Sequence, residues 1–331
     1  MREIDKTPEV SIIVPMYKTP FVLLRRCINS VLKQSFQSYE LLVVDDGSGS
    51  DYDAFKEEYE AKDPRVHFLT KENGGVASAR NYGIEHSRGK FISFIDSDDY
   101  VDEYFIEGLY NAIHGCEMSL CGVTEMYFPM EDSLYNEKMF FSLPSHFCGL
   151  QFINFSVNKL YHREILMEHN IRFPLDVKLG EDALFLAEYY RYCKYMRCIP
   201  DCRYHYCLNT ESAMRSFKPE YWSWETKVIQ KDWDLFHQYP LALREEYAIL
   251  HWLYDKMMGA ANYYYDYEGD PAKLEQHLQA ILDNEIIQKL FTTDLSEDTL
   301  HFTPQEKKRV KVISRQGVKG LRKFLHKRAA D

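Results

Sequence analysis

Asp96, Asp98 and Asp99 place three carboxylates within four residues, in the stretch Asp-Ser-Asp-Asp. Carboxylates this close repel one another unless a cation or hydrogen-bond donors compensate their charge. Carboxylate oxygens are ligands that Mg²⁺ and Mn²⁺ prefer, and such an ion can bridge the protein to diphosphate oxygens. Alternatively, Ser97 or Asp98 caps a helix that begins near Asp102. The stretch therefore predicts either a divalent-metal site or a helix N-cap.

Three other polar stretches accompany this one. Residues 45–48 (DDGS) include Asp46 and by themselves indicate an ordinary turn. Residues 73–75 (NGG) precede a helix whose first amides would face a phosphate, with Arg80 one turn further on. Residues 180–182 (GED) begin another helix, where a carboxylate serves either as a cap or as a general base.

The elements that must position these residues alternate between strand and helix. Short β-branched or apolar runs predict buried strands, and amphipathic spacing predicts helices between them. The strands are expected at residues 10–15, 40–44, 66–69 and 90–95, and the helices at 22–33, 54–61 and 76–86. This alternation predicts an α/β fold with a mostly parallel sheet. Ligands of such sheets lie beyond the carboxyl ends of the strands, where both acidic stretches fall.

The remainder of the chain predicts a change of character near residue 215. Helices are expected at 158–169 and 181–193, and a strand pair or edge strand at 196–208. Long aromatic helices follow. We therefore expect a first domain over residues 1–215, divided into two halves (8–115 and 116–215), with a helical extension over 216–331. Exposed aromatic residues after Trp222 would support a homodimer.

Composition and charge narrow the function classes. The chain has 331 residues, 45% hydrophobic residues and a net charge of -11. No apolar run approaches the roughly 20 residues that span a bilayer, and the N-terminus lacks a secretory signal, so a cytoplasmic protein is expected. Nucleic-acid binding is not expected, because the body of the chain is acidic.

The C-terminal segment is the exception to this acidity. Residues 307–328 contain ten Lys or Arg and no Asp or Glu. Val310, Ile313 and Leu321 recur among them at roughly helical spacing. The segment predicts either a helix lying on an anionic membrane, at the inner face of the plasma membrane, or a solvated helix weakened by its glycines.

Taken together, these stretches resemble the family 2 glycosyltransferases of GT-A fold, over residues 10 to about 215. The matching segments are VSIIVPMY from Val10, SVLKQSF ending at Phe36, ELLVVDDGS from Glu40, NGGVASARNYGI from Asn73, GKFISFIDSDDY from Gly89, NKLYHREIL from Asn158 and IRFPLDVKLGEDALF from Ile171. The resemblance implies a GT-A fold, a Rossmann-like nucleotide-binding sheet flanked by helices, with the C-terminal helical extension.

The resemblance also implies where a nucleotide-sugar donor binds. Tyr17, next to Pro15, would offer an aromatic face to the base, and Asp46 would accept from a uracil N–H. Arg80 would lie near the nucleotide, with Gly75 at the start of its helix. Asp96 would contact the ribose and Asp98 the metal, Mn²⁺ or Mg²⁺, with Asp99 sharing that work. The metal and Arg80 would neutralise the leaving UDP.

For the transfer itself, the resemblance implies that Asp182 is the catalytic base that deprotonates the acceptor hydroxyl, with inversion at the anomeric carbon. Glu181 lies beside it and is the alternative base. His205 is either a further metal ligand or a structural histidine. Arg215 would order a loop over the diphosphate.

The function expected is therefore an inverting hexosyl- or N-acetylhexosaminyltransferase, which moves a sugar from a UDP-sugar to a bacterial glycan or lipid-linked acceptor. Two alternatives stay open. One is a nucleotidyltransferase, although Pro15, Met16 and Tyr17 stand where such enzymes carry a glycine-rich basic loop. The other is a catalytically silent carbohydrate- or nucleotide-binding protein of the same fold.

Overall fold

The chain forms two compact units, each described here by itself. The computed structural model describes residues 7–124, 133–136, 155–207, 217–238 and 242–325. Unit 1 comprises Met1–Glu137 and Phe152–Thr210, and unit 2 comprises Lys138–Gln151 and Glu211–Asp331. Arg215 lies outside the described residues.

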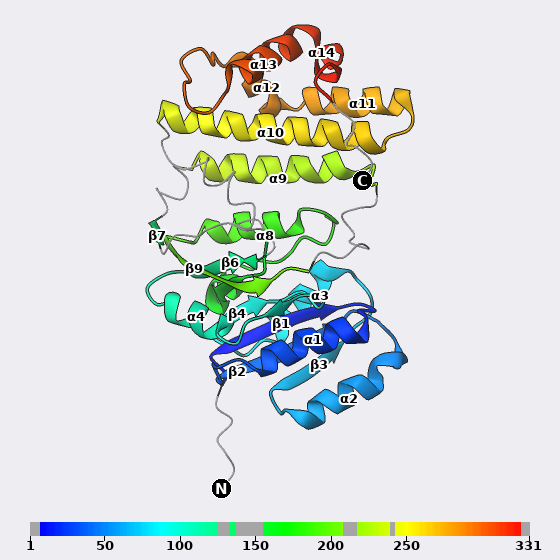
Figure 1. Ribbon diagram of the computed structural model, residues 1–331, viewed down its shortest axis with the longest axis vertical. Helices are drawn as coiled ribbons and strands as arrows, with labels where there is room; N and C mark the ends of the chain where they lie inside the picture. The colour runs from blue at the N-terminus through cyan, green and yellow to red at the C-terminus, as the bar shows by residue number, and fades with distance from the viewer. Residues whose placement is uncertain (1–6, 125–132, 137–154, 208–216, 239–241, 326–331) are drawn as a thin grey trace. The chain divides into compact units, whose positions relative to one another are not determined.

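Unit 1 is an α/β structure, as expected (Figure 1). Its strands are β1 (Val10–Met16), β2 (Tyr39–Asp45), β3 (Val66–Thr70), β4 (Phe91–Phe94), β5 (Tyr100–Val101), β6 (Met118–Val123), β7 (Ser133–Asn136), β8 (Lys159–His162) and β9 (Tyr195–His205). Its helices are α1 (Phe21–Leu32), the short η1 (Ser50–Tyr52), α2 (Asp53–Lys62), α3 (Val76–His86), α4 (Phe105–Ala112), α7 (Arg163–Glu168) and α8 (Glu181–Tyr190).

One sheet runs through unit 1 in the order β3-β2-β1-β4-β8-β6-β9-β5, with β7 also paired to β9. Strands β3, β2, β1 and β4 are mutually parallel. β1 pairs with β4 only over Val10–Ile13, whereas its pairing with β2 continues to Met16. Pro15 therefore lies beyond the β4 ladder, where its missing N–H costs no ladder hydrogen bond.

The second half of the sheet is mixed, and here the expected helix at 158–169 is wrong in its first part. Residues Lys159–His162 form β8, antiparallel to both β4 and β6, and α7 follows it. The side chains of Lys159, Leu160 and Tyr161 are fully buried. A four-residue stretch is too short for periodicity to separate strand from helix, and its pairing partners decided the outcome.

The parallel half places the acidic stretches at one edge. Asp45 ends β2 and Asp96 follows β4, so both lie at carboxyl ends of parallel strands. α3 packs close to β1, because a Cβ added at Gly83 would stand 2.5 Å from Ile13 Cγ2. This close approach determines where the residues on α3 are held.

Unit 2 is helical, as the sequence predicts for this region. It consists of α9 (Tyr221–Phe236), α10 (Leu243–Tyr267), α11 (Pro271–Leu282), α12 (Glu285–Thr292), α13 (Pro304–Gln316) and α14 (Val318–Arg322). Local capping sets several helix starts: Asp270 accepts from the Ala272 amide at 2.8 Å, Asn284 accepts from Ile286 at 3.0 Å, and Thr303 with Glu306 forms a capping box.

Burial in unit 2 corrects two expectations. Trp222 and Trp252 lie in the core of the unit, 8% and 4% exposed, so they do not form the exposed aromatic surface expected to support a homodimer. In the basic segment, Val310, Ile313 and Leu321 are also buried. Over its described residues, 307–325, most apolar side chains are therefore buried in unit 2, and no fully exposed apolar stripe of the kind that inserts into a bilayer is present.

Among the helices of the described residues, none combines the length and the hydrophobicity that crossing a membrane requires.

The Gly83 contact generates a stability prediction. Gly83→Ala should lower the free energy of unfolding by about 1–3 kcal/mol, because the new methyl group overlaps Ile13 and α3 must shift. Denaturant unfolding followed by circular dichroism measures this. Gly259→Ala is the matched control: Gly259 is exposed in the interior of α10 with nothing within 4 Å, so alanine should stabilise that helix by about 0.5–1 kcal/mol. Equal effects of the two substitutions would contradict the packing argument.

Candidate functional site

A single buried guanidinium, that of Arg80, joins three of the predicted site carboxylates. Its Nη1 lies 2.7 Å from Asp182 Oδ1 and its Nη2 lies 2.8 Å from Asp96 Oδ1. Glu181 Oε1 lies 3.6 Å from Nη1. Asp96 and Asp182 are 86 residues apart in the chain, so this network exists only because the sheet brings α3, the loop after β4 and the start of α8 together.

Each member of the network is positioned by a different element. Arg80 lies in α3, held against β1 by the Gly83 contact, and its guanidinium carbon lies 5.2 Å from the centre of the Phe173 ring. Asn81 exchanges two hydrogen bonds of 2.8 Å with the backbone of Phe173, which fixes that ring below Arg80. Asp182 lies in the first turn of α8, after Gly180 in the left-handed conformation (φ 93°).

Asp182 does not cap its own helix. Its Oδ1 accepts from Arg80, and its Oδ2 accepts from the Ser156 amide at 3.1 Å. Both partners come from outside α8, so the capping interpretation of this residue is wrong. The carboxylate instead lies where Arg80 and the Ser156 turn meet.

The network has a permanently charged centre and a carboxyl of altered acidity. Burial alone would lower the pKa of Arg80, but the charges of Asp182 and Asp96 outweigh it and raise that pKa. Burial raises the pKa of Glu181 to about 7, and the neighbouring Asp182 adds to this, against the opposing effect of Arg80. Glu181 is therefore the member of this network that changes charge near neutral pH.

The Asp96–Asp99 stretch is a tight loop and not a helix cap. α4 begins at Phe105 without a side-chain cap, and the hydroxyl of Ser97 instead pairs with Thr19 at 2.8 Å. The N-cap interpretation of this stretch is therefore wrong.

Asp99 is held inside the protein by two donors. The Tyr204 hydroxyl donates to Oδ2 at 2.6 Å and the Cys207 amide donates to Oδ1 at 2.8 Å, and the residue is 1% exposed. Burial raises the pKa of Asp99 to about 8, and the negative charge of Asp96 adds to this. This geometry suits a carboxyl that supports the loop better than one that faces a ligand.

Asp98 and Asp96 are the more accessible members of the loop. Asp98 is half-buried, and the side chain of Asp96 keeps 31% of its area exposed beside Arg80. Within the described residues, no group of three or more His, Cys, Asp and Glu side chains is arranged to hold a metal ion. The donor set here consists of two carboxylates, which fits an ion that takes its other ligands from water and a diphosphate.

The two predicted nucleotide contacts Asp46 and Gly75 are paired with each other. Asp46 Oδ2 accepts from the Gly75 amide at 2.7 Å, and Oδ1 accepts from Lys71 Nζ at 2.6 Å and from the Gly74 amide at 3.0 Å. The start of α3 therefore faces a protein carboxylate in this structure. The Asp46 side chain is only 3% exposed.

The remaining predicted residues differ in their surroundings. Tyr17 is 49% exposed directly after β1, whereas Pro15 is buried within it. His205 donates to or accepts from both Asp102, at 2.7 Å, and Thr124, at 3.3 Å, and stacks on Tyr100 with ring centres 4.3 Å apart. Both ring nitrogens of His205 are thus used within the protein, as in a structural histidine.

Sequence reasoning missed several residues that build this site. Lys71 neutralises Asp46, Tyr204 holds Asp99, Phe173 supports Arg80, and the Ser156 amide holds Asp182. Phe173 lies in a segment that carried the family resemblance, and Tyr204 immediately precedes His205, but neither residue type indicates chemistry by itself. A backbone amide leaves no signal in a sequence.

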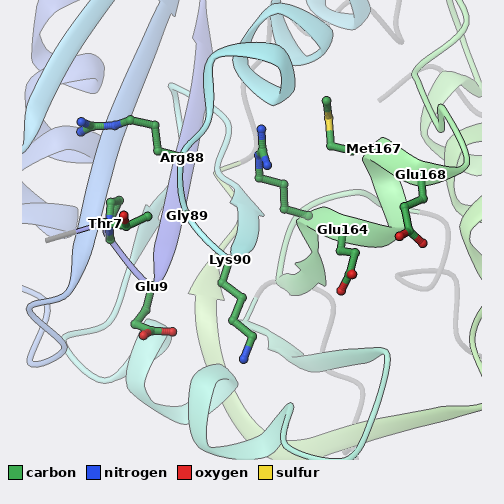
Figure 2. Close-up of a pocket in the computed structure, with 10 residues that line it drawn as sticks. Thr7, Glu9, Arg88, Gly89, Lys90, Glu164, Met167 and Glu168 are labelled. Carbon is green, nitrogen blue, oxygen red and sulfur yellow. The ribbon is translucent and has the colours of Figure 1, made fainter.

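A separate cavity of about 430 Å³ lies at the opposite ends of the strands (Figure 2). Glu9 and Lys90, which precede β1 and β4, line it together with Arg88, Glu164 and Glu168. It contains none of the predicted site residues. Because it lies beyond the amino ends of β1 and β4, it is not part of the Arg80 network.

The Arg80 network can accept a proton or attract a cation at the edge of the sheet formed by the carboxyl ends of the parallel strands. The side chains of Asp96, Asp182 and Glu181 are 31%, 18% and 15% exposed, so solvent or a ligand reaches them, while Arg80 is 4% exposed. Three carboxylates around one guanidinium leave net negative charge. Such a site can accept a proton from a hydroxyl and can attract a divalent cation.

Comparison with known proteins shows that the chain is similar to glycosyltransferases. Residues 11–170 match the family model described as glycosyl transferase family 2. The uncharacterized glycosyltransferase EpsJ of Bacillus subtilis is 29% identical over 248 residues, which cover 71% of this chain and 72% of EpsJ.

Two solved structures show the same fold. The crystal structure of Staphylococcus aureus TarS in complex with UDP-GlcNAc superposes with a TM-score of 0.67 at 21% identity, over 85% of this chain and 83% of that one. The mannosyltransferase PcManGT of Pyrobaculum calidifontis, in complex with GDP-Man and Mn²⁺, superposes with a TM-score of 0.51 at 14% identity, over 86% and 83%. The GT-A fold with a C-terminal helical region is thereby confirmed.

The raised pKa of Glu181 generates a prediction about pH. Because the folded protein keeps this proton up to about pH 7, instead of the ordinary 4.5, folding loses stability as pH rises through 7. Glu181→Gln cannot ionise, so it should match the wild type below about pH 4 and exceed its free energy of unfolding by about 1–3 kcal/mol at about pH 8. Glu57→Gln, on the exposed face of α2, should follow the wild type at both values. A constant difference between Glu181→Gln and the wild type would contradict the assignment.

Proposed function

We propose, from the match of residues 11–170 to the model of glycosyl transferase family 2, that the chain is a member of this family and transfers a sugar, with inversion, from a UDP-sugar to a hydroxyl of a bacterial glycan or lipid-linked acceptor. The observation that carries the proposal is the Arg80 bridge. One guanidinium links Asp96, on the donor side, to Asp182, on the acceptor side. Such a bridge would couple the donor side to the base electrostatically, and this supports the proposal.

Asp182 is the general base of the proposed reaction. Its carboxylate takes the proton of the acceptor hydroxyl while that oxygen attacks the anomeric carbon, and the bond from this carbon to the diphosphate oxygen breaks with its electron pair. Each oxygen of Asp182 accepts one protein donor and keeps a second lone pair for the proton. Arg80 stabilises the charge that develops on the leaving nucleoside diphosphate.

Asp98 is the proposed metal-facing residue, for Mn²⁺ or Mg²⁺, and Asp96, proposed to face the donor ribose, is the second accessible carboxylate beside it. When bound, the ion would neutralise the diphosphate as it leaves. Two accessible carboxylates fit an ion held mainly by water and substrate phosphates. For Asp99 we propose support of the loop through Tyr204 and Cys207 in place of direct ligation, because its oxygens are buried and hydrogen-bonded.

Donor recognition is proposed on the exposed ring of Tyr17, which follows β1 beside the Asp46 loop. The complex of TarS with UDP-GlcNAc supports a uracil nucleotide and an N-acetylhexosamine. TarS is named a poly(ribitol-phosphate) β-N-acetylglucosaminyltransferase, and this chain matches 36% of its full length at 28% identity. Since Asp46 is nearly inaccessible, a uracil N–H reaches it only after Lys71 moves aside.

The alternatives differ in their products. A nucleotidyltransferase releases inorganic pyrophosphate, and a silent binding protein binds a nucleotide without turnover. A glycosyltransferase releases the nucleoside diphosphate.

The first test measures UDP or GDP release from a panel of UDP- and GDP-sugars with Mn²⁺ or with EDTA. We expect release from one UDP-sugar that requires the metal. Asp182→Asn should lower kcat by about 10²- to 10⁴-fold through loss of the base, and Asp98→Ala by at least about 100-fold through loss of charge stabilisation. Asp234→Asn, an exposed carboxylate of α9, is the control and should retain full activity.

Each contrary result has its own meaning. Full activity of Asp182→Asn would remove that residue from the role of base. Pyrophosphate as the product would establish a nucleotidyltransferase, and nucleotide binding without release would favour the silent binding protein.

The basic segment of unit 2 remains a proposed contact to anionic lipid, now through charge alone. Lys308, Lys311 and Arg315 are exposed on α13, whereas Val310 and Ile313 between them are buried. The triple change Lys308→Ser, Lys311→Ser and Arg315→Ser should weaken binding to vesicles that contain anionic lipid by about 1 kcal/mol per charge, without unfolding the unit. Cosedimentation measures this, with neutral vesicles as control. Equal binding of variant and wild type would refute membrane contact through this segment.

A further inference from the structure

The turn formed by residues 155–158 is built around one buried lysine, Lys159, the first residue of β8. Its Nζ donates to the Phe155 carbonyl at 2.6 Å, to the Asn158 side-chain oxygen at 2.9 Å and to the Val157 carbonyl at 3.4 Å. The Tyr161 hydroxyl donates to the remaining carbonyl of the turn, that of Ser156, at 2.8 Å. Two side chains of β8 therefore hold three consecutive carbonyl groups.

This arrangement determines where the Ser156 amide points. With the carbonyls of residues 155–157 held from the β8 side, the amide of Ser156 donates to Asp182 Oδ2 at 3.1 Å. Asn158, in the left-handed region at φ 58°, closes the turn. Asp182 Oδ1 thus accepts a hydrogen bond from Arg80, and Oδ2 accepts one from the turn that Lys159 holds in place.

Lys159 is an unusual residue at this place. It is 0% exposed, in a strand between β4 and β6. Burial lowers the pKa of Lys159 to about 7, and the negative charge of Asp182 opposes that change. Three oxygen acceptors match the three N–H donors of an ammonium group. An isolated buried charge is costly, so a strand of this kind would normally carry an apolar residue.

We propose that Lys159 is a positioning residue for Asp182: its buried ammonium fixes the 155–158 turn, and the Ser156 amide transmits that position to the carboxylate. The inference rests on the proposed function, in which Asp182 is the general base. Lys159 contacts neither donor nor acceptor, and acts only through the turn and its charge. A base held by two fixed donors keeps its free lone pairs in one direction, which is what proton abstraction from a bound hydroxyl requires.

The test compares Lys159→Met, which keeps the length of the side chain and removes the charge, with the wild type in the nucleotide-release assay. We expect kcat to fall about 10- to 100-fold through misplacement of the base, while KM for the donor stays unchanged. Lys33→Met, an exposed lysine after α1, is the control and should match the wild type. Circular dichroism and the melting temperature establish that the variant is folded.

A pH profile of kcat supplies a readout that a merely structural role would not move. The charged or titratable groups around Asp182 are Arg80 from α3, Glu181 from α8, Asp96 after β4, and Lys159 and Tyr161 from β8. Lys159→Met removes only one positive charge from this set. The acid limb of the profile should therefore move to higher pH, because a carboxylate that loses a nearby cation is protonated more readily.

Tyr161→Phe keeps the experiment decisive if Lys159→Met does not fold. It removes only the hydroxyl that holds the Ser156 carbonyl, so we expect a smaller fall in kcat, again with unchanged KM and with the acid limb in place. Wild-type kcat in a folded Lys159→Met, or a change in KM alone, would overturn the inference. Asp182→Asn is measured in parallel, so that failure of the proposed base can be told apart from failure of the positioning role. If Asp182→Asn is fully active, Asp182 is not the base. If Asp182→Asn is inactive but Lys159→Met is fully active, Lys159 does not position the base.

Discussion

The site depends on the burial of one positive charge. Arg80 is enclosed by α3, the Phe173 ring and the carboxylates of Asp96 and Asp182. A guanidinium removed from water needs opposite charges close by, and those carboxylates in turn need a cation if they are to ionise side by side. Each group therefore requires the others, and the sheet, α3 and α8 must all be in place before any of them is stable.

The negative charges of the other acidic residues at this edge are balanced by different partners. Although burial opposes it, the hydrogen bonds from Lys56 and Ser48 lower the pKa of Asp45, which ends β2. Asp46 is neutralised by Lys71 and two glycine amides, and Asp99 is held by Tyr204. Three of the carboxylates that look alike in the sequence, Asp45, Asp46 and Asp99, are thus paired within the protein in this structure. Asp96 and Asp98 remain the more accessible ones.

The same distinction between support and chemistry applies to the second half of unit 1. The 155–158 turn, β8 and α8 place a backbone amide and a buried ammonium behind Asp182. Similarly, Val310, Ile313 and Leu321 of the basic segment belong to the core of unit 2, whereas Lys308, Lys311 and Arg315 are exposed. A residue's type shows what it can do, but its neighbours decide which of those possibilities is used.

The sequence by itself determined the α/β order of unit 1, the helical character of unit 2 and the edge of the sheet at which Asp46 and Asp96 lie, because these follow from local periodicity and from chain direction in parallel strands. The short stretch at Lys159 was misassigned as helix, since four residues are too few to show a distinguishable period. Only the tertiary structure decided that Arg80 bridges Asp96 and Asp182, that the Gly75 amide binds Asp46, and that Asp99 is buried against Tyr204. These contacts join residues far apart in the chain, and their distances and burial depend on how strands and helices pack.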